Sequence, residues 1–166
     1  VGCVWGEVDW NEAARLLRLY DPAITVIDGL PETTKARELQ AEFKRLKVWL
    51  CYYGDGGSTN KKDEFFTMNY REGTVLADRT RALDETFARF YEGKNVIPQG
   101  AKQSIPHYYD QVKAPTRVLE KKRDGSSVAR YVEGTAADHF AHAENYCTIA
   151  SIKRHASGGQ AGVLDY

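Results

Sequence analysis

Residues 23–29 read Ala-Ile-Thr-Val-Ile-Asp-Gly, a short apolar run rich in β-branched side chains that ends in an acidic residue and a glycine. Such a run predicts a strand over Ala23–Ile27 that is buried on both faces, with Asp28 and Gly29 ending it. A strand buried on both faces needs helices above and below it, so the neighbouring sequence decides the fold class.

Helices are expected on both sides of this strand. Asp9 and Glu12 have the spacing of a capping box and predict a helix over Trp10–Tyr20. Pro31 and Thr33 open a second helix, whose predicted apolar face contains Leu39, Phe43 and Leu46. A second buried strand follows over residues 48–53. This alternation predicts an α/β layer with parallel pairing, and Val1–Trp5 is expected to be a further strand.

The rest of the chain predicts two hairpins and two helices. Residues 65–70 and 74–77 form the first expected hairpin, and residues 116–122 and 127–132 form the second. Asp78 caps a helix to about Tyr91, residues 95–115 are expected to be irregular, and residues 136–153 form the last helix. The core-facing side chains of the two helices are predicted to be Leu83, Phe87 and either Phe90 or Tyr91, and Phe140, Ala143, Cys147 and Ala150.

Composition excludes several classes of protein. The chain has 166 residues, 42% of them hydrophobic and 28% charged, as expected for one globular domain. No apolar run approaches the ~18 residues of a membrane span. Three cysteines do not suggest a disulfide framework and favour a reduced, intracellular setting. With 23 basic and 23 acidic residues the net charge is zero, so any nucleic-acid contact must come from a local patch.

Asp28 is the first candidate site residue, because ligands gather at the carboxyl ends of strands in open α/β sheets. The same position suits an Asp-Gly turn in which the carboxylate only binds nearby backbone. Glu32 lies just beyond, where a favourable interaction with a helix N-terminus is the plainer interpretation.

Asp138 is the second candidate, in a stretch that also contains His139, His142 and Glu144. Asp138 and His142 are four residues apart and therefore share a helix face. Carboxylates without cysteines suit Mg²⁺ or Mn²⁺ rather than zinc. The alternative is an acidic residue that only stabilises the start of the helix.

A basic cluster is the third feature. Its members are Lys113, Arg117, Lys121, Lys122 and Arg123, with Arg79 and Arg81 as a weaker second group. Most such runs are solvated surface, but a basic hairpin beside an acidic site also fits a phosphodiester substrate. The motifs of serine hydrolases, P-loop proteins and dinucleotide-binding proteins are absent from the sequence.

Three stretches in this order resemble the nuclease domain of the tailed-phage terminase large subunit. They are Thr25-Val26-Ile27-Asp28-Gly29, which closes on Pro31-Glu32, then Asp78-Arg79-Thr80-Arg81-Ala82-Leu83-Asp84, and Ala137-Asp138-His139-Phe140-Ala141-His142-Ala143-Glu144-Asn145-Tyr146. The resemblance covers about residues 1–152, and its third stretch is the most specific. It implies an RNase H-like fold, in which a mixed central sheet is flanked by helices and carries hairpin insertions.

The resemblance also implies an activity: a Mg²⁺- or Mn²⁺-dependent endonuclease that cuts double-stranded DNA during phage genome packaging, with two ions in the intact site. Asp28 and Asp138 match two catalytic, metal-binding acids. Glu32 and His142 are possible accessory residues, and Arg79, Arg117, Lys121, Lys122 and Arg123 are expected to contact DNA. The implied partners are the terminase ATPase domain, the small terminase subunit and the portal, in the cytoplasm of a bacterial host carrying a phage or prophage.

One departure from the family concerns its first catalytic aspartate, whose strand would precede Val1. We therefore expect residues 1–155 to form a nuclease domain without its first strand, an absence that would impair cleavage, and residues 156–166 to form a flexible tail. Two alternatives stay open. One is a non-catalytic DNA-binding or motor-docking module of the same fold, and the other is a different RNase H-like nuclease such as a resolvase.

Overall fold

The computed structural model describes residues 9–44, 46–54, 64–95, 97, 99–132 and 134–156. The strand expected over Val1–Trp5 and nearly all of the expected tail lie outside these ranges, as do residues 55–63 between the second buried strand and the first hairpin. Among the described residues, no helix has the length and apolar character needed to cross a membrane.

A four-stranded mixed sheet forms the centre of the described chain, in the order β1-β2-β4-β3. The strands are β1 (Thr25–Asp28), β2 (Val48–Gly54), β3 (Phe66–Asn69) and β4 (Thr74–Asp78). β1, β2 and β4 are mutually parallel, whereas β3 pairs with β4 as the predicted antiparallel hairpin. The α/β class and the parallel pairing of the first two strands are therefore confirmed.

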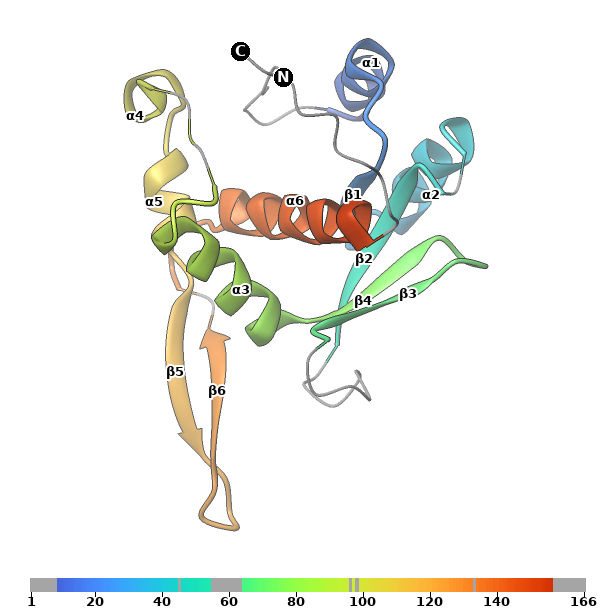
Figure 1. Cartoon of the computed structure of the whole chain (residues 1–166). Helices are drawn as coiled ribbons and strands as arrows, with labels where there is room; N and C mark the ends of the chain where they lie inside the picture. The colour runs from blue at the N-terminus through green and yellow to red at the C-terminus, as the bar shows by residue number, and fades with distance from the viewer. Residues whose placement is uncertain are drawn as a thin grey trace.

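Helices pack on both faces of the sheet because its strands alternate their apolar side chains between two cores. Val26 and Trp49 belong to a core that also contains residues of α6 (His139–Ala156). Ile27 and Val48 belong to the opposite core, with residues of α1 (Trp10–Tyr20) and α2 (Thr33–Glu42). Figure 1 shows α6 lying across the sheet, while α1 and α2 lie apart from α6, near β1 and β2.

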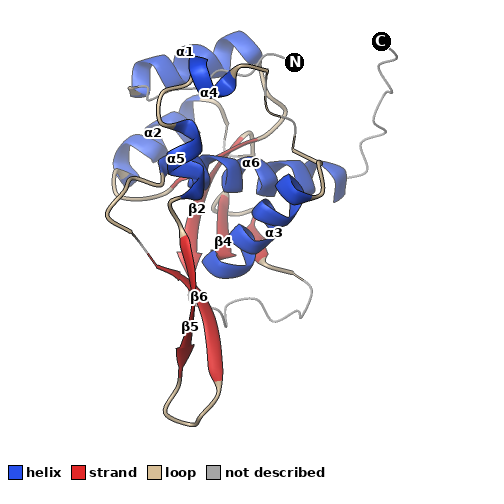
Figure 2. Ribbon diagram, turned by 90° about the vertical axis from the view of Figure 1, so that its left-hand side faces the viewer, coloured by secondary structure: helices blue, strands red, loops and turns tan. Residues whose placement is uncertain are grey.

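A second hairpin extends away from this body, as Figure 2 shows. It consists of β5 (Thr116–Lys121) and β6 (Ser127–Val132), which pair only with each other among the described strands. Along the chain, three helices separate β4 from β5. They are α3 (Arg79–Tyr91), α4 (Ala101–Ser104) and α5 (Tyr108–Lys113). The predicted positions of the hairpin and of α3 are confirmed.

The end of the second helix and the irregular character of residues 95–115 were predicted wrongly. The second helix ends at Glu42, and Leu46 is 55% exposed rather than part of its apolar face. Lys44 adopts a left-handed backbone conformation with φ of 71°, which ends the helical path before Leu46. Residues 95–115 contain the short helices α4 and α5, which are too brief to give a periodic hydrophobic signal.

α6 begins at His139 rather than at residue 136 and continues to Ala156, and its core-facing side also differs from the prediction. Ala143 and Cys147 are exposed, so Cys147 does not lie on a buried apolar face. The buried side instead includes Glu144, Asn145 and Thr148. Buried polar groups are tolerated where they are hydrogen-bonded, so a search for apolar residues selects the wrong face. On α3, Tyr91 is 91% exposed and does not face the core.

Candidate functional site

Three polar side chains lie where the parallel strands end. Asp28 is the last residue of β1, Tyr53 lies near the end of β2, and Arg79 directly follows β4. Parallel strands bring their carboxyl ends to one edge of the sheet, which is where open α/β sheets bind ligands. The topology therefore gathers a carboxylate, a phenol and a guanidinium at the same edge.

Helix α6 supplies the opposite side of this site. Asp138 lies directly before the helix, and its backbone carbonyl accepts a hydrogen bond from the His142 amide. His142 and Tyr146 follow at intervals of four residues, so the three side chains lie in a row along one face. Each contacts a different strand end, because the helix runs across the edge of the sheet.

Asp28 is held by two hydrogen bonds. One carboxylate oxygen accepts from the backbone amide of Leu30 at 2.9 Å, and the other accepts from the Tyr146 hydroxyl at 2.8 Å. The turn contact considered for Asp28 is thus present, together with a contact to a distant helix. The residue is exposed, so its carboxylate is accessible to a ligand.

Asp138 is held by a different pair of groups. Its Oδ2 lies 3.2 Å from Nε2 of His142 and 3.6 Å from a guanidinium nitrogen of Arg79. The Asp138 side chain is 19% exposed. The cation beside it gives this carboxylate a positively charged neighbour that Asp28 does not have among the contacts described.

The two aspartates are linked through Tyr53, Tyr146 and His142. The Tyr53 hydroxyl lies 2.7 Å from Nδ1 of His142, and the Tyr53 and Tyr146 rings stack with centroids 5.9 Å apart. We call Asp28, Tyr146, Tyr53, His142, Asp138 and Arg79 the carboxylate network.

Hydrogen-bonding groups surround both ring nitrogens of His142. Asn145 donates to the Tyr53 hydroxyl at 2.7 Å, and that hydroxyl lies 2.7 Å from Nδ1 of His142. Nε2 lies 3.2 Å from Asp138 and 3.4 Å from the Arg79 guanidinium. Burial lowers the pKa of His142, which outweighs the opposite effect of the Asp138 carboxylate. Burial also raises the pKa of Tyr53 and of Tyr146, so both phenols stay protonated and can donate.

The other acidic and histidine candidates do not join this network. Glu32 accepts a hydrogen bond from the Trp10 indole at 2.5 Å and makes no capping bond to α2. His139 is exposed, while Glu144 accepts from the Tyr108 hydroxyl at 2.8 Å on a buried side of α6. Within the described ranges, no three His, Cys, Asp or Glu side chains converge as a ready-made metal site.

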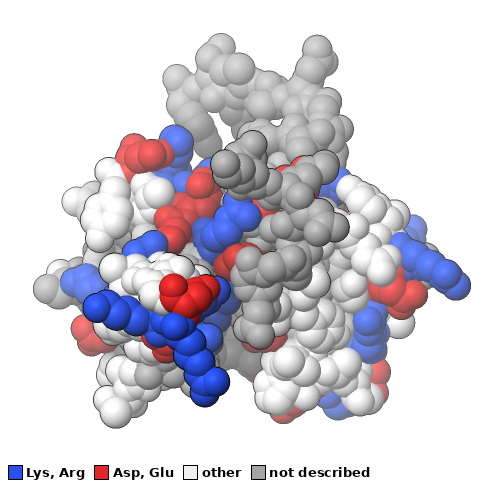
Figure 3. Space-filling model, turned by 90° about the horizontal axis from the view of Figure 1, so that it is seen from below, with Lys and Arg blue, Asp and Glu red and all other residues white. Residues whose placement is uncertain are grey.

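A basic groove lies beside the network, between the β5–β6 hairpin and the start of α3. Its volume is about 1000 Å³. The charged residues lining this hairpin groove are Arg79, Arg81, Arg117, Lys122 and Arg130, against Asp78 and Asp84. Five cations and two acids leave an excess of three positive charges. Figure 3, seen from the hairpin side, shows Lys and Arg side chains gathered there with acidic side chains among them.

The predicted DNA-contacting residues differ in their surroundings. Arg117 donates to both carboxylate oxygens of Asp84, at 2.9 and 3.2 Å, which neutralises part of its charge. Lys121, Lys122 and Arg123 are exposed at the far end of the hairpin. Of these three, Lys122 lines the groove.

Sequence reasoning missed the tyrosines and the asparagine of the site. The four-residue spacing that relates Asp138 to His142 extends to Tyr146, so that residue carried a usable signal. Tyr53 and Asn145 gave none, because their roles depend on packing between β2 and α6. Comparison of the chain with family models, with curated proteins and with solved structures found no match.

Proposed function

We propose that this chain is a metal-dependent endonuclease domain of the terminase type, with an RNase H-like sheet, that hydrolyses phosphodiester bonds of double-stranded DNA. The observation that carries the proposal is the carboxylate network. Asp28 and Asp138 are distant in sequence, yet both are fixed by side chains of one helix at the carboxyl edge of the sheet.

The donor types of the network fit a hard divalent cation. Mg²⁺ is commonly bound by one or two carboxylates together with water and substrate phosphate, rather than by a complete protein cage. Asp28 and Asp138 supply two such carboxylates. Tyr146 contacts the first and His142 the second, and carboxylates that bind metals commonly have such hydrogen-bonding neighbours. When bound, Mg²⁺ or Mn²⁺ would activate water and stabilise the leaving oxygen.

The chain's own residues have separate tasks in this proposal. Tyr146 holds one oxygen of Asp28, and His142 holds one oxygen of Asp138. Arg79 carries a positive charge beside Asp138, where a phosphate oxygen would be attracted. The hairpin groove supports the choice of substrate, because its excess positive charge suits a phosphodiester backbone and carries no base code.

Cleavage of supercoiled plasmid tests the proposal, with Mn²⁺, Mg²⁺ or EDTA in parallel reactions. We expect nicked and linear products with metal and none with EDTA. Asp28→Asn and Asp138→Asn keep side-chain size and are expected to reduce cleavage by about 100-fold or more, whereas Tyr146→Phe costs about 10- to 100-fold. Asp110→Asn, at an exposed position on α5, is the matched control. Cleavage that survives both site substitutions contradicts the proposal.

A second candidate is a non-catalytic DNA-binding module of the same fold. The Arg79–Asp138 ion pair favours it, because a bound guanidinium can satisfy this carboxylate without a metal. Plasmid binding in a gel-shift assay without cleavage in any metal supports the module and argues against the endonuclease.

A further inference from the structure

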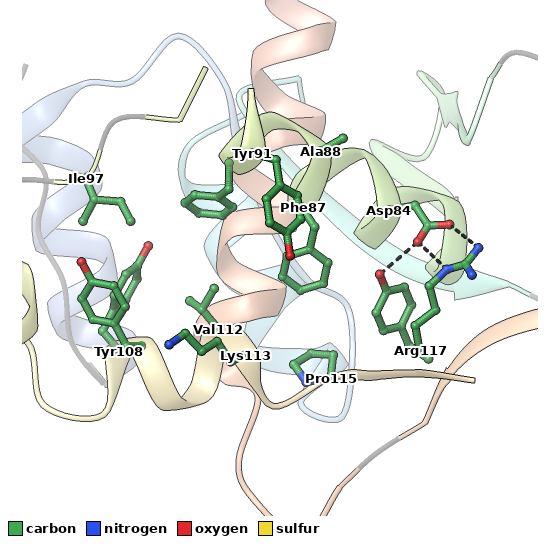
Figure 4. Close-up of a pocket in the computed structure, with 13 residues that line it drawn as sticks. Asp84, Phe87, Ala88, Tyr91, Ile97, Tyr108, Val112, Lys113, Pro115 and Arg117 are labelled. Carbon is green, nitrogen blue, oxygen red and sulfur yellow. Dashed lines mark hydrogen bonds and ion pairs between the residues drawn. The ribbon is translucent and has the colours of Figure 1, made fainter. Parts of the chain in front are cut away.

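A second cavity, of about 660 Å³, lies between α3 and α5 at the base of the hairpin. Figure 4 shows Phe87 and Tyr91 of α3 on one side, with Val112 and Lys113 of α5 on the other. Its lining is mainly apolar and aromatic. The aromatic residues of this cavity, which we call the aromatic pocket, are Phe87, Phe90, Tyr91, Tyr108, Tyr109 and Tyr131.

Four of these rings, those of Tyr91, Phe87, Phe90 and Tyr109, offer accessible surface, whereas Tyr108 is buried. Tyr91 is 91% exposed at the cavity mouth, and Phe87, Phe90 and Tyr109 are only partly buried. An aromatic face accepts any planar partner without sequence preference, because every nucleobase also presents a π-face.

One unpaired cation lies at the rim. The Lys113 ammonium is 5.8 Å from the centre of the Tyr109 ring, and its contacts among the described residues include no ion pair with a carboxylate. An apolar partner alone would gain nothing from this charge. A ligand that joins a flat aromatic group to an anion would use both features.

The aromatic pocket adjoins the hairpin groove. Asp84, Arg117 and Tyr131 line both cavities, and the Tyr131 hydroxyl donates to Asp84 at 2.9 Å. These three residues form a shared wall, so a strand whose phosphates follow the basic groove can reach the pocket with a base.

We propose that the aromatic pocket binds an unpaired nucleotide of single-stranded nucleic acid, with the base stacked on Tyr91 and a phosphate beside Lys113. The inference takes its class of ligand, nucleic acid, from the proposed function, but it requires no cleavage. The chain would then have a second contact with nucleic acid, which binds an unpaired base rather than a base pair of a duplex.

The test measures binding of fluorescein-labelled dT10 by anisotropy in EDTA, so that it is independent of metal and cleavage. Tyr91→Ala is expected to raise Kd by roughly 5- to 100-fold, as loss of one stacked base does, and Tyr91→Phe restores the wild-type value. Lys113→Gln is expected to weaken binding and to lower its salt dependence. A blunt 20-base-pair duplex should bind equally to wild type and Tyr91→Ala.

Tyr20→Ala is the matched control, since Tyr20 is 48% exposed on α1 and lines neither cavity. A chain of ten abasic residues, which keeps the phosphates, should bind wild type as weakly as dT10 binds Tyr91→Ala. Equal binding of dT10 and the abasic chain overturns the proposal. So does unchanged dT10 binding by both Tyr91→Ala and Lys113→Gln, the result expected if the pocket receives an apolar protein segment instead. Plasmid cleavage can fail while dT10 binding holds, so the two proposals are tested separately.

Discussion

Asn145 illustrates how single residues hold the site together. It is fully buried, accepts a hydrogen bond from Thr86 at 3.1 Å and donates to Tyr53 at 2.7 Å. A buried amide without hydrogen-bond partners lowers the free energy of unfolding by about 1–3 kcal/mol. The two hydrogen bonds of Asn145 avoid this penalty. Through the Tyr53 hydroxyl, which lies 2.7 Å from Nδ1 of His142, Asn145 is connected to the carboxylate network.

Glu144 predicts a pH dependence at the same scale. Burial raises its pKa, and the hydrogen bond from Tyr108 only partly opposes this effect. The folded protein therefore binds this proton more tightly than the unfolded chain does. The resulting stabilisation is fully present below the ordinary glutamate value of 4.5 and is lost as the pH rises through the folded-state pKa.

We expect Glu144→Gln to unfold at a higher urea concentration than wild type at neutral pH, with the difference shrinking as the pH falls toward 4.5. Tyr108→Phe removes the hydrogen bond that favours the charged form of Glu144. The pKa of Glu144 should then rise further, so that its protonated form stabilises the fold up to a higher pH. Urea titrations at several pH values measure both changes. A constant difference between Glu144→Gln and wild type across this range would contradict the assignment.

At the scale of elements, helix starts are the part of the fold that local chemistry specifies best. Asp9 accepts from the Glu12 amide at 2.8 Å, and Asp78 accepts from the Arg81 amide at 3.1 Å. Both contacts join residues three apart and were predicted, because a cap depends on its own turn alone. The buried side of α6 was not predicted correctly, because hydrogen bonds to other elements determine which of its residues are buried.

The cap of α3 gives a prediction for this element. Asp78→Ala is expected to lower the free energy of unfolding by about 1–2 kcal/mol, because the Arg81 amide loses its acceptor at a buried position. Asp78→Asn keeps an acceptor oxygen and should cost much less. Urea unfolding with unchanged slope measures both. Equal losses in the two variants would indicate that the charge matters, rather than the cap.

At the scale of the whole molecule, the charge is balanced in number but not in space. The net charge is zero, whereas the hairpin groove has an excess of three positive charges. The proposed DNA binding is therefore expected to depend on that groove and to weaken with salt, because each neutralised phosphate releases counterions.

Lys122→Gln tests this distribution. It is expected to weaken duplex binding at low salt and to reduce the slope of log Kd against log salt by about 1. Lys35→Gln, on α2 and paired with Glu38, removes the same charge outside the groove and should leave the slope unchanged. Fluorescence anisotropy with a labelled duplex over a salt series gives both values. Equal effects of the two variants would show that overall charge, not the groove, controls binding.

The sequence by itself determined most of the local elements and the α/β class. Trp10–Tyr20, the buried strand β2 and both hairpins follow from periodicity, caps and turn residues, which act between neighbours in the chain. Sequence also selected Asp28 and Asp138 as candidate residues. Only the tertiary structure decided what surrounds them, because Tyr146 meets Asp28 and Arg79 meets Asp138 across long stretches of chain. Such contacts depend on how a helix packs across a sheet, and local patterns do not encode that packing.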